Sequence, residues 1–252
     1  MGGGGNPDSP GSVAIDNAVG LDVVAVVSAG NSGPGERTIG SPGTARKAIT
    51  VGAIDKNLSI AKFSSRGPVI WKHQELFQPI KRFSIIKPDI VAPGVNIYAA
   101  SPNMEYKTLS GTSMSAPHVS GLAALIKQKN DNWSAEQIKS AIKNSAIILQ
   151  EPEKVNIQGF GGIDAYKALF DYANPLIVSI DPIQQDSFVI NITGKIIGDN
   201  FYNYKLFYVR NAPLGNISES EHLIISSNLI PSEGLLFANF KPFELAEGEY
   251  LI

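Results

Sequence analysis

Cysteine is absent from this 252-residue chain. Its absence excludes disulfide bonds, thiol catalysis and metal sites built from thiolates. The chain also lacks any run of 18 consecutive apolar residues, so no membrane-spanning segment is expected. Positive charge is not in excess, because 21 basic side chains face 23 acidic ones and the formal net charge is −2. Nucleic-acid binding needs a basic face, so we expect no nucleic-acid partner.

The amino terminus lacks the features of a secretory signal peptide. Its sequence, Met-Gly-Gly-Gly-Gly-Asn-Pro-Asp, has neither a basic region nor an apolar one. The glycines alone would suit a tag-like linker. Apolar residues make up 43% of the chain, and its length suffices for one large domain or two smaller ones, so a sizeable core is expected.

The first part of the chain alternates helix-like and strand-like segments. Residues 11–18 have the spacing of a short helix begun by Ser9 or Ser12, and residues 21–27 form a Val-rich run typical of a buried strand. Further strands are expected at 49–53 and 97–100. A helix followed by such a strand predicts an α/β fold with a mostly parallel sheet, in which ligands bind at the carboxyl ends of the strands.

The most informative motif covers residues 110–121 and reads Ser-Gly-Thr-Ser-Met-Ser-Ala-Pro-His-Val-Ser-Gly. It leads into an apolar helix expected at 119–127. A serine at a helix start has free backbone N–H groups and the positive end of the helix dipole beside it, so Ser113 suits a nucleophile. The alternative is that Thr112 or Ser113 caps the helix through its hydroxyl.

This motif resembles the nucleophile segment of the subtilisin-like serine proteases, with Ser113 at the position of the nucleophile. The segment that begins at Ser28, Ser-Ala-Gly-Asn-Ser-Gly-Pro, resembles the oxyanion-hole segment of that family, with Asn31 as the donor. A turn role beside glycine is the alternative for Asn31. The opening glycines resemble the substrate-binding strand of the family, which implies that Gly3 and Gly4 line the substrate pocket.

The resemblance implies a partial subtilisin-like sheet flanked by helices and a serine endopeptidase that cleaves peptide or protein substrates through an acyl-enzyme on Ser113. The segments at 41–46, 63–68 and 87–94 also resemble the family and are expected to be scaffold. His118 lies five residues after Ser113, so in a helix it points to another face, and the family motif gives it a structural role. Residues 69–86 are expected to form an irregular surface insertion with aromatic anchors, for which substrate contact is a weaker alternative.

Composition changes near residue 171, which divides the chain into a partial catalytic domain at 1–171 and a second domain at 172–252. Short β-rich runs follow at 188–193, 204–209 and 223–226, separated by turn residues. This pattern predicts a small, partial β-sandwich module, and it resembles modules appended to large secreted subtilases.

Two segments of the family pattern have no counterpart here. The triad acid lies in an Asp-[Ser/Thr]-Gly segment and the triad base in a His-Gly-Thr segment, and neither sequence occurs among the 252 residues. The resemblance therefore implies that the chain begins inside the catalytic domain and is an inactive fragment that requires the missing amino-terminal half. Without that half, an apolar edge should be exposed. A non-catalytic binding or scaffold fragment is the alternative function.

No cofactor is expected. The resemblance allows calcium, but no cluster of aspartates has the spacing of a calcium loop, so no metal site is assigned. The resemblance also implies that the intact protein is extracellular or bound to the cell surface.

Overall fold

The computed structural model describes residues 5–73, 81–149 and 155–171, together with the strands of the carboxyl-terminal part whose bounds are given below. The chain divides into two compact units, Met1–Ala173 and Asn174–Ile252. Each unit is described by itself.

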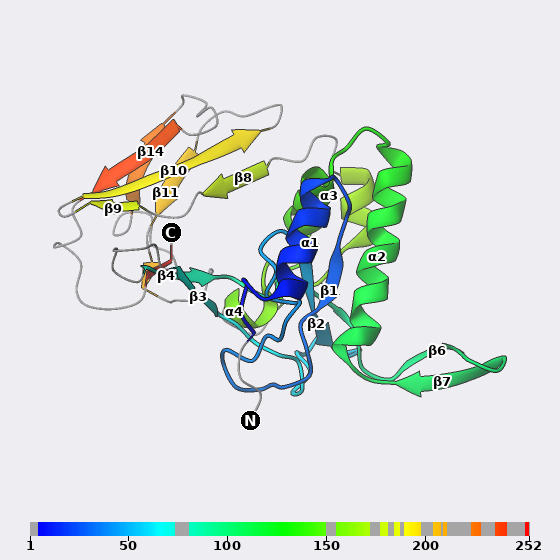
Figure 1. The fold of residues 1–252 in the computed structure, drawn as a ribbon. Coiled ribbons are helices and arrows are strands. Elements are labelled where there is room, and N and C mark those ends of the chain that lie inside the picture. Colours follow the sequence, from blue (N-terminus) through cyan, green and yellow to red (C-terminus); the bar gives the residue numbers. More distant parts are fainter. Residues whose placement is uncertain are drawn as a thin grey trace. The chain divides into compact units, whose positions relative to one another are not determined.

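A parallel sheet forms the centre of the first unit (Figure 1). Its strand order is β1-β2-β5, and both pairings are parallel. The strands are β1 (Val26–Ser28), β2 (Ile49–Ile54) and β5 (Ile90–Pro93). All six residues of β2 are buried, which marks it as the central strand. The expected α/β fold with a parallel sheet is confirmed.

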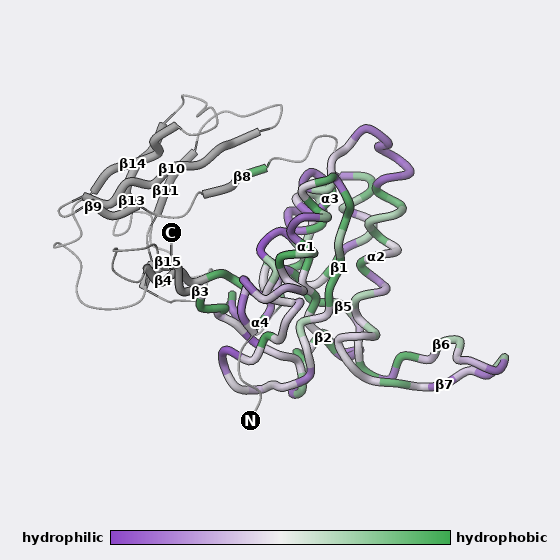
Figure 2. Tube along the Cα trace, in the orientation of Figure 1, coloured by the Kyte–Doolittle hydropathy of each residue, from purple (hydrophilic) through white to green (hydrophobic). Residues whose placement is uncertain are grey.

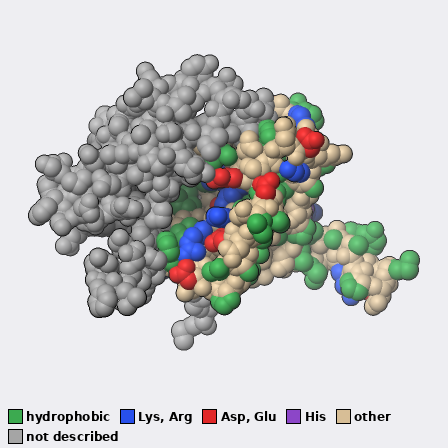
Figure 3. Space-filling view, turned by 45° about the horizontal axis from the view of Figure 1, so that its top comes forward, with side chains coloured by type: hydrophobic (Ala, Val, Ile, Leu, Met, Phe, Trp, Pro, Cys, Tyr) green, Lys and Arg blue, Asp and Glu red, His purple; other side chains and the backbone are tan. Residues whose placement is uncertain are grey.

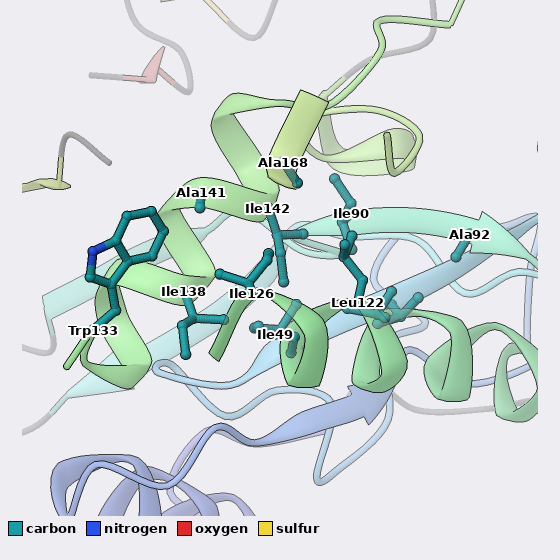
Figure 4. Close-up of a cluster of buried hydrophobic side chains, with 13 residues drawn as sticks. Ile49, Ile90, Ala92, Leu122, Ile126, Trp133, Ile138, Ala141, Ile142 and Ala168 are labelled. Carbon is teal, nitrogen blue, oxygen red and sulfur yellow. The ribbon is translucent and has the colours of Figure 1, made fainter. Parts of the chain in front are cut away.

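Helix α2 (Thr112–Lys129) packs against this sheet and supplies much of the core. The other helices are α1 (Pro10–Gly20), α3 (Ala135–Asn144), the short α4 (Val155–Gln158) and a π-helical turn, η1 (Lys167–Asp171). One cluster of buried side chains joins the sheet to α2 and α3 (Figure 4). It includes Ile49, Ile90, Leu122, Ile126, Ile138 and Ile142. The apolar helix expected at 119–127 is confirmed as part of α2, and its Leu125 is 49% exposed.

Hydropathy follows this packing. Hydrophobic colour runs along β1, and hydrophilic colour gathers in the turn between α2 and α3 (Figure 2). Within the described residues, no helix combines the length and hydropathy needed to cross a membrane.

The helix starts are fixed by side chains that the sequence identifies. Ser9 caps α1 by accepting a hydrogen bond from the backbone N–H of Ser12. Ser134 and Gln137 form a capping box at α3, in which each side chain accepts from the backbone N–H of the other. Of the two helix starts that the sequence offers for α1, Ser9 and Ser12, the structure shows Ser9.

The third strand of the sheet is β5, and the prediction of a buried strand at 97–100 is wrong. Those residues belong to β6 (Ile97–Ser101), which pairs antiparallel with β7 (Glu105–Leu109) in a separate hairpin. Tyr98, at the centre of the expected strand, is 70% exposed. A short apolar run does not reveal which strand it pairs with, and β5 was overlooked because prolines flank it and it is only four residues long.

The expected strand at 21–27 is also shorter than predicted. Asp22 has a positive φ of 66°, so the chain turns there and β1 begins only at Val26. The Asp22 carboxylate accepts a hydrogen bond of 2.6 Å from the backbone N–H of Ala135, at the start of α3. The side chains of β1 are half-buried rather than fully buried.

The described residues of the segment at 69–86 form two paired antiparallel strands, so the prediction of an irregular segment is wrong for them. Its strands are β3 (Val69–His73) and β4 (Lys81–Ile85). Trp71 anchors it, as the aromatic composition indicates: its ring N–H donates to Asp8 at 2.6 Å, and the Arg46 guanidinium lies 4.1 Å from the ring centroid.

The second unit is described through its strands alone. A four-stranded antiparallel sheet contains β8 (Ile177–Ile180), β9 (Gln184–Asp186), β10 (Val189–Ile197) and β14 (Leu235–Phe240). Two further antiparallel pairs join β11 (Tyr204–Phe207) to β13 (Leu223–Ser227) and β12 (Val209–Arg210) to β15 (Tyr250–Leu251). The β-rich character is confirmed, whereas the β-sandwich arrangement stays a prediction.

A glycine segment lies beside the outer edge of β5. The backbone N–H of Val91 donates to Gly161 at 2.9 Å, and the N–H of Ile163 donates to Val91 at 3.0 Å. Gly159 approaches the backbone of Pro88 and Asp89 so closely that a Cβ would collide with both carbonyl oxygens, and its φ is +63°. Residues 159–163 therefore cover the edge of the sheet next to β5.

A buried cluster of charges lies where β5 begins. Asp89 accepts hydrogen bonds from the Lys87 ammonium at 2.6 Å and from the backbone N–H of Thr50 at 2.8 Å. The Lys139 ammonium lies 3.0 Å from the second carboxylate oxygen of Asp89. Both lysines also donate to the carbonyl oxygen of Ala48. The cluster therefore ties β5 to β2 and to α3.

Burial alone would raise the pKa of Asp89, but the cations Lys139, Lys87 and Lys143 together hold its pKa well below the usual range. The Asp89 carboxylate is ionised in the folded and unfolded states above its unfolded pKa of about 4. Its contribution to stability is therefore fully present above about pH 4, and it is lost as the pH falls below that value toward the folded pKa.

We predict that Asp89→Asn lowers the free energy of unfolding by about 3–5 kcal/mol at pH 7, because it leaves buried ammonium groups without their counter-charge. Urea denaturation followed by tryptophan fluorescence measures the change. The difference from the parent chain should be constant between pH 5 and pH 7 and should shrink below about pH 4. Asp131→Asn, in an exposed turn, is the control. A loss equal to that of the control would contradict the stabilising role of the cluster.

Candidate active site

The ends of all three parallel strands meet the start of α2. The N–H of Gly94, which follows β5, donates to Ile54 at the end of β2 at 2.9 Å. The N–H of Gly111 in turn donates to Gly94 at 2.8 Å. From the end of β1, the N–H of Gly30 donates to the Thr112 hydroxyl at 3.1 Å. The beginning of α2 is therefore held at the carboxyl edge of the sheet, where α/β proteins bind their ligands.

Asn31 is joined directly to this helix start. Its side-chain oxygen accepts one hydrogen bond from the backbone N–H of Thr112 at 2.9 Å and another from the Thr112 hydroxyl at 3.0 Å. With the oxygen occupied in this way, the amide nitrogen is the part of the side chain left to serve as a donor. That nitrogen lies 3.2 Å from the position that a Cβ on Gly111 would take. The Asn31 amide therefore lies next to the segment that carries Ser113.

Ser113 is the second residue of α2, and it is exposed. Its backbone N–H lies in the first turn, where no helical carbonyl is available to accept it. The proposed alternative, a hydroxyl cap from Thr112 or Ser113, is wrong, because the capping position is Gly111 and no side chain caps the helix. Thr112 uses its hydroxyl to connect Gly30 and Asn31 instead.

Beneath Ser113, the helix approaches the backbone of the sheet very closely. The Ser115 hydroxyl lies where a Cβ on Gly94 would collide with it, and the same Cβ would lie 2.9 Å from the Gly111 carbonyl oxygen. Ser115 is fully buried, and among the described residues its hydroxyl oxygen has no hydrogen-bond partner. Only glycine at 94 permits this contact, and the contact fixes the distance between α2 and the strand ends.

The remaining predicted residues lie elsewhere or outside the described residues. His118 is exposed, and its Nδ1 lies 2.9 Å from the carbonyl oxygen of Met114 in the same helix. Gly3 and Gly4 fall outside the described residues, as does His222, and the side chain of His73 is not described. The structure thus brings Asn31 to the Ser113 segment, and the roles of both residues stay predictions.

The sequence did not predict that Thr112 connects the start of α2 to Gly30 and Asn31. The sequence motif includes Thr112 between Gly111 and Ser113, but the residue to which it bonds is 81 positions away. The Asp89 cluster was likewise expected only as scaffold. Within the described residues, no group of three or more histidines and acidic residues is arranged to hold a metal ion.

The parallel sheet, with Ser113 in the first turn of α2 and the Asn31 side chain bonded to the same turn, defines an α/β protein whose candidate site lies at the carboxyl edge of the sheet. Comparison with known proteins agrees. A model of the subtilase family matches residues 2–161, which is more than half of the chain. The chain belongs to the subtilase family.

Two curated relatives illustrate the similarity. Serine protease AprX of Bacillus subtilis (strain 168) is 39% identical over 173 residues, covering 60% of this chain and 36% of that protein. Subtilisin Savinase of Lederbergia lenta is 39% identical over 155 residues, covering 62% of this chain and 49% of that protein. The chain therefore spans about a third to a half of the length of these relatives.

A solved structure supports the fold. The self-cleaved protease domain of PatA superimposes with a TM-score of 0.50 at 23% identity, covering 63% of this chain and 53% of that chain. At this identity the likeness concerns the fold alone.

We predict that Ser115→Ala raises the free energy of unfolding by about 1 kcal/mol, because a buried hydroxyl without a partner costs about that much to desolvate. Ser120→Ala in the same helix is the matched control, since its exposed hydroxyl donates to Ala116 at 3.2 Å. Urea denaturation of the two variants compares them. Destabilisation by Ser115→Ala beyond that of the control would show that the hydroxyl has a stabilising partner.

Proposed function

We propose that this chain is the part of a subtilisin-like serine endopeptidase that carries the nucleophile, Ser113, and the oxyanion donor, Asn31. The observation that supports this most strongly is the pair of hydrogen bonds from Thr112 to the Asn31 oxygen. They direct the amide nitrogen of Asn31 away from Thr112 and keep it beside the helix that begins with the nucleophile segment. The substrates are peptides or proteins, in line with the family.

In the proposed reaction, the Ser113 hydroxyl oxygen attacks the carbonyl carbon of the scissile peptide bond. Negative charge develops on the carbonyl oxygen, and the Asn31 amide and the Ser113 backbone N–H stabilise it. The intermediate collapses to an acyl-enzyme as the amine leaves with a proton. Water then attacks the acyl carbon and gives up a proton, and the second intermediate collapses to the carboxylic acid as the Ser113 oxygen leaves and regains a proton.

The reaction needs a base within hydrogen-bond reach of Ser113, because a serine hydroxyl is a weak nucleophile while it is protonated. His118 does not meet this need, because it is exposed with its Nδ1 against Met114. We propose that the base and its acid come from the Asp and His segments of the subtilase pattern, contributed by an amino-terminal half of the catalytic domain. The same resemblance supports an extracellular or cell-surface location for the intact protein.

We predict that the 252-residue chain alone shows little Ser113-dependent peptide turnover and little reaction with a fluorophosphonate probe. Co-folding with an amino-terminal subtilase half that carries both segments should give turnover. In that assembly Ser113→Ala should abolish it, and Asn31→Ala should lower kcat by about 10²–10³-fold, the known cost of losing this donor in a subtilisin.

Each outcome of this experiment decides between interpretations. Robust Ser113-dependent turnover by the chain alone would show that it holds its own base, and His73 would then be tested first. A correctly co-folded assembly that neither turns over peptide nor reacts with the probe would favour a non-catalytic binding fragment.

A further prediction concerns Thr112. Thr112→Val removes one of the two hydrogen bonds to the Asn31 oxygen and the acceptor for the Gly30 N–H, while the backbone bond from Thr112 remains. In the co-folded assembly its loss of kcat should be smaller than that of Asn31→Ala. It should add little in the Asn31→Ala background, because both changes act on one donor. Fully additive losses would show that Thr112 acts independently of Asn31.

A further inference from the structure

The β6–β7 hairpin extends away from the rest of the first unit (Figure 1). Eight of its ten strand residues are exposed, including all five residues of β7, and none of the ten is buried. Asn103 and Met104, both with positive φ, turn the chain at the tip, and Met104 is fully exposed. The surface view shows hydrophobic side chains over this projection (Figure 3).

The two faces of the hairpin differ in chemistry. The register pairs Tyr98 with Thr108 and Ala100 with Tyr106, so these four side chains share one face. The rings of Tyr98 and Tyr106 stack with centroids 5.3 Å apart, although the two side chains are 70% and 62% exposed. This aromatic face carries no charge.

The charged residues of the hairpin lie on the opposite face. The register places Glu105 opposite Ser101 and Lys107 opposite Ala99. The two charges compensate each other, since the Lys107 ammonium lies 3.4 Å from the Glu105 carboxylate. The hairpin therefore offers an uncharged, aromatic surface, which suits an uncharged apolar partner better than a charged one.

The edges of the hairpin are open as well. In the described part of the chain, β6 pairs with β7 and neither strand pairs with any other. An unpaired strand edge presents backbone N–H and C=O groups to which an extended polypeptide can add as a further strand.

The hairpin is continuous with the nucleophile segment. At its base the Asn96 N–H donates to the Ser110 hydroxyl at 2.8 Å, and Gly111 follows at once with its bond to Gly94. Ser113 is only three residues beyond Ser110. A polypeptide lying along the hairpin therefore approaches the start of α2.

We propose that the β6–β7 hairpin is a secondary binding arm for protein substrates. It takes up an extended, uncharged and apolar stretch of an unfolded polypeptide, which pairs with a free edge of the hairpin and packs on Tyr98 and Tyr106. Another stretch of the same polypeptide reaches Ser113. This role rests on the proposed peptidase function and adds a preference for unfolded protein chains over short peptides.

The test uses two neighbouring alanines of β6 that lie on opposite faces of the hairpin. Ala100→Glu places a charge beside Tyr106 on the aromatic face, whereas Ala99→Glu places one beside Lys107 on the opposite face. Both positions are exposed, so neither change disturbs a core. The chain carries Ser113→Ala, and fluorescence anisotropy measures its binding to labelled, reduced and carboxymethylated lactalbumin, which stays unfolded.

Ala100→Glu should weaken this binding by about tenfold or more, as expected for loss of an aromatic contact in an apolar surface, and Ala99→Glu should leave it unchanged. Tyr98→Ser with Tyr106→Ser should weaken it as well. Tyr166→Ser with Phe170→Ser, a second exposed ring pair with centroids 5.1 Å apart, should not. Equal losses in all variants, or none, would overturn the proposal.

A second copy of this chain is the competing partner for the aromatic face. Analytical ultracentrifugation of the same variants measures whether the chain associates with itself through that face. Loss of self-association in Ala100→Glu without any change in lactalbumin binding would also overturn the proposal. In the co-folded assembly, Ala100→Glu should raise KM for the unfolded protein and leave kcat/KM for a short peptide unchanged. The anisotropy assay measures binding and needs no peptide cleavage. Its result therefore does not depend on whether Ser113 is a nucleophile.

Discussion

The structure of the first unit depends on the close backbone contact between the strand ends and the start of α2. The bonds from Gly94 to Ile54 and from Gly111 to Gly94 hold the helix at a height that only a glycine at 94 permits. The Thr112 hydroxyl adds the end of β1 to the same point. Because this contact is made by backbone groups of three strands, the location of Ser113 is a property of the whole sheet and not of its own loop.

The sequence predicts best what is encoded locally. The cap by Ser9 involves a partner three residues away, and Ser9 is one of the two helix starts that the sequence predicts. Strand pairing is encoded by partners far apart along the chain, and there the prediction failed. An apolar run at 97–100 satisfies the pattern of a buried strand, but only the observed ladder with β7 shows that its side chains face solvent.

The same distinction applies to the candidate site. Ser113 and Asn31 are recognisable because each lies in a contiguous motif. Thr112, which organises their surroundings, acts on Asn31 across a long separation. The Asp89 cluster, at the opposite end of β5, depends in the same way on the distant Lys139. A buried carboxylate balanced by Lys87 in its own segment and by Lys139 of α3 has no clear signature in the sequence, since any one of these residues alone would be expected at the surface.

The glycine segment beside β5 has a consequence for the order in which the unit is made. Synthesis proceeds from the amino terminus, so Val91 is present long before Gly161 and Ile163, which bond to it. Until those residues are available, one margin of the sheet remains open to any other extended chain, including a neighbouring nascent copy. The interval between completion of β5 and release of residue 163 therefore leaves this edge of the sheet unprotected.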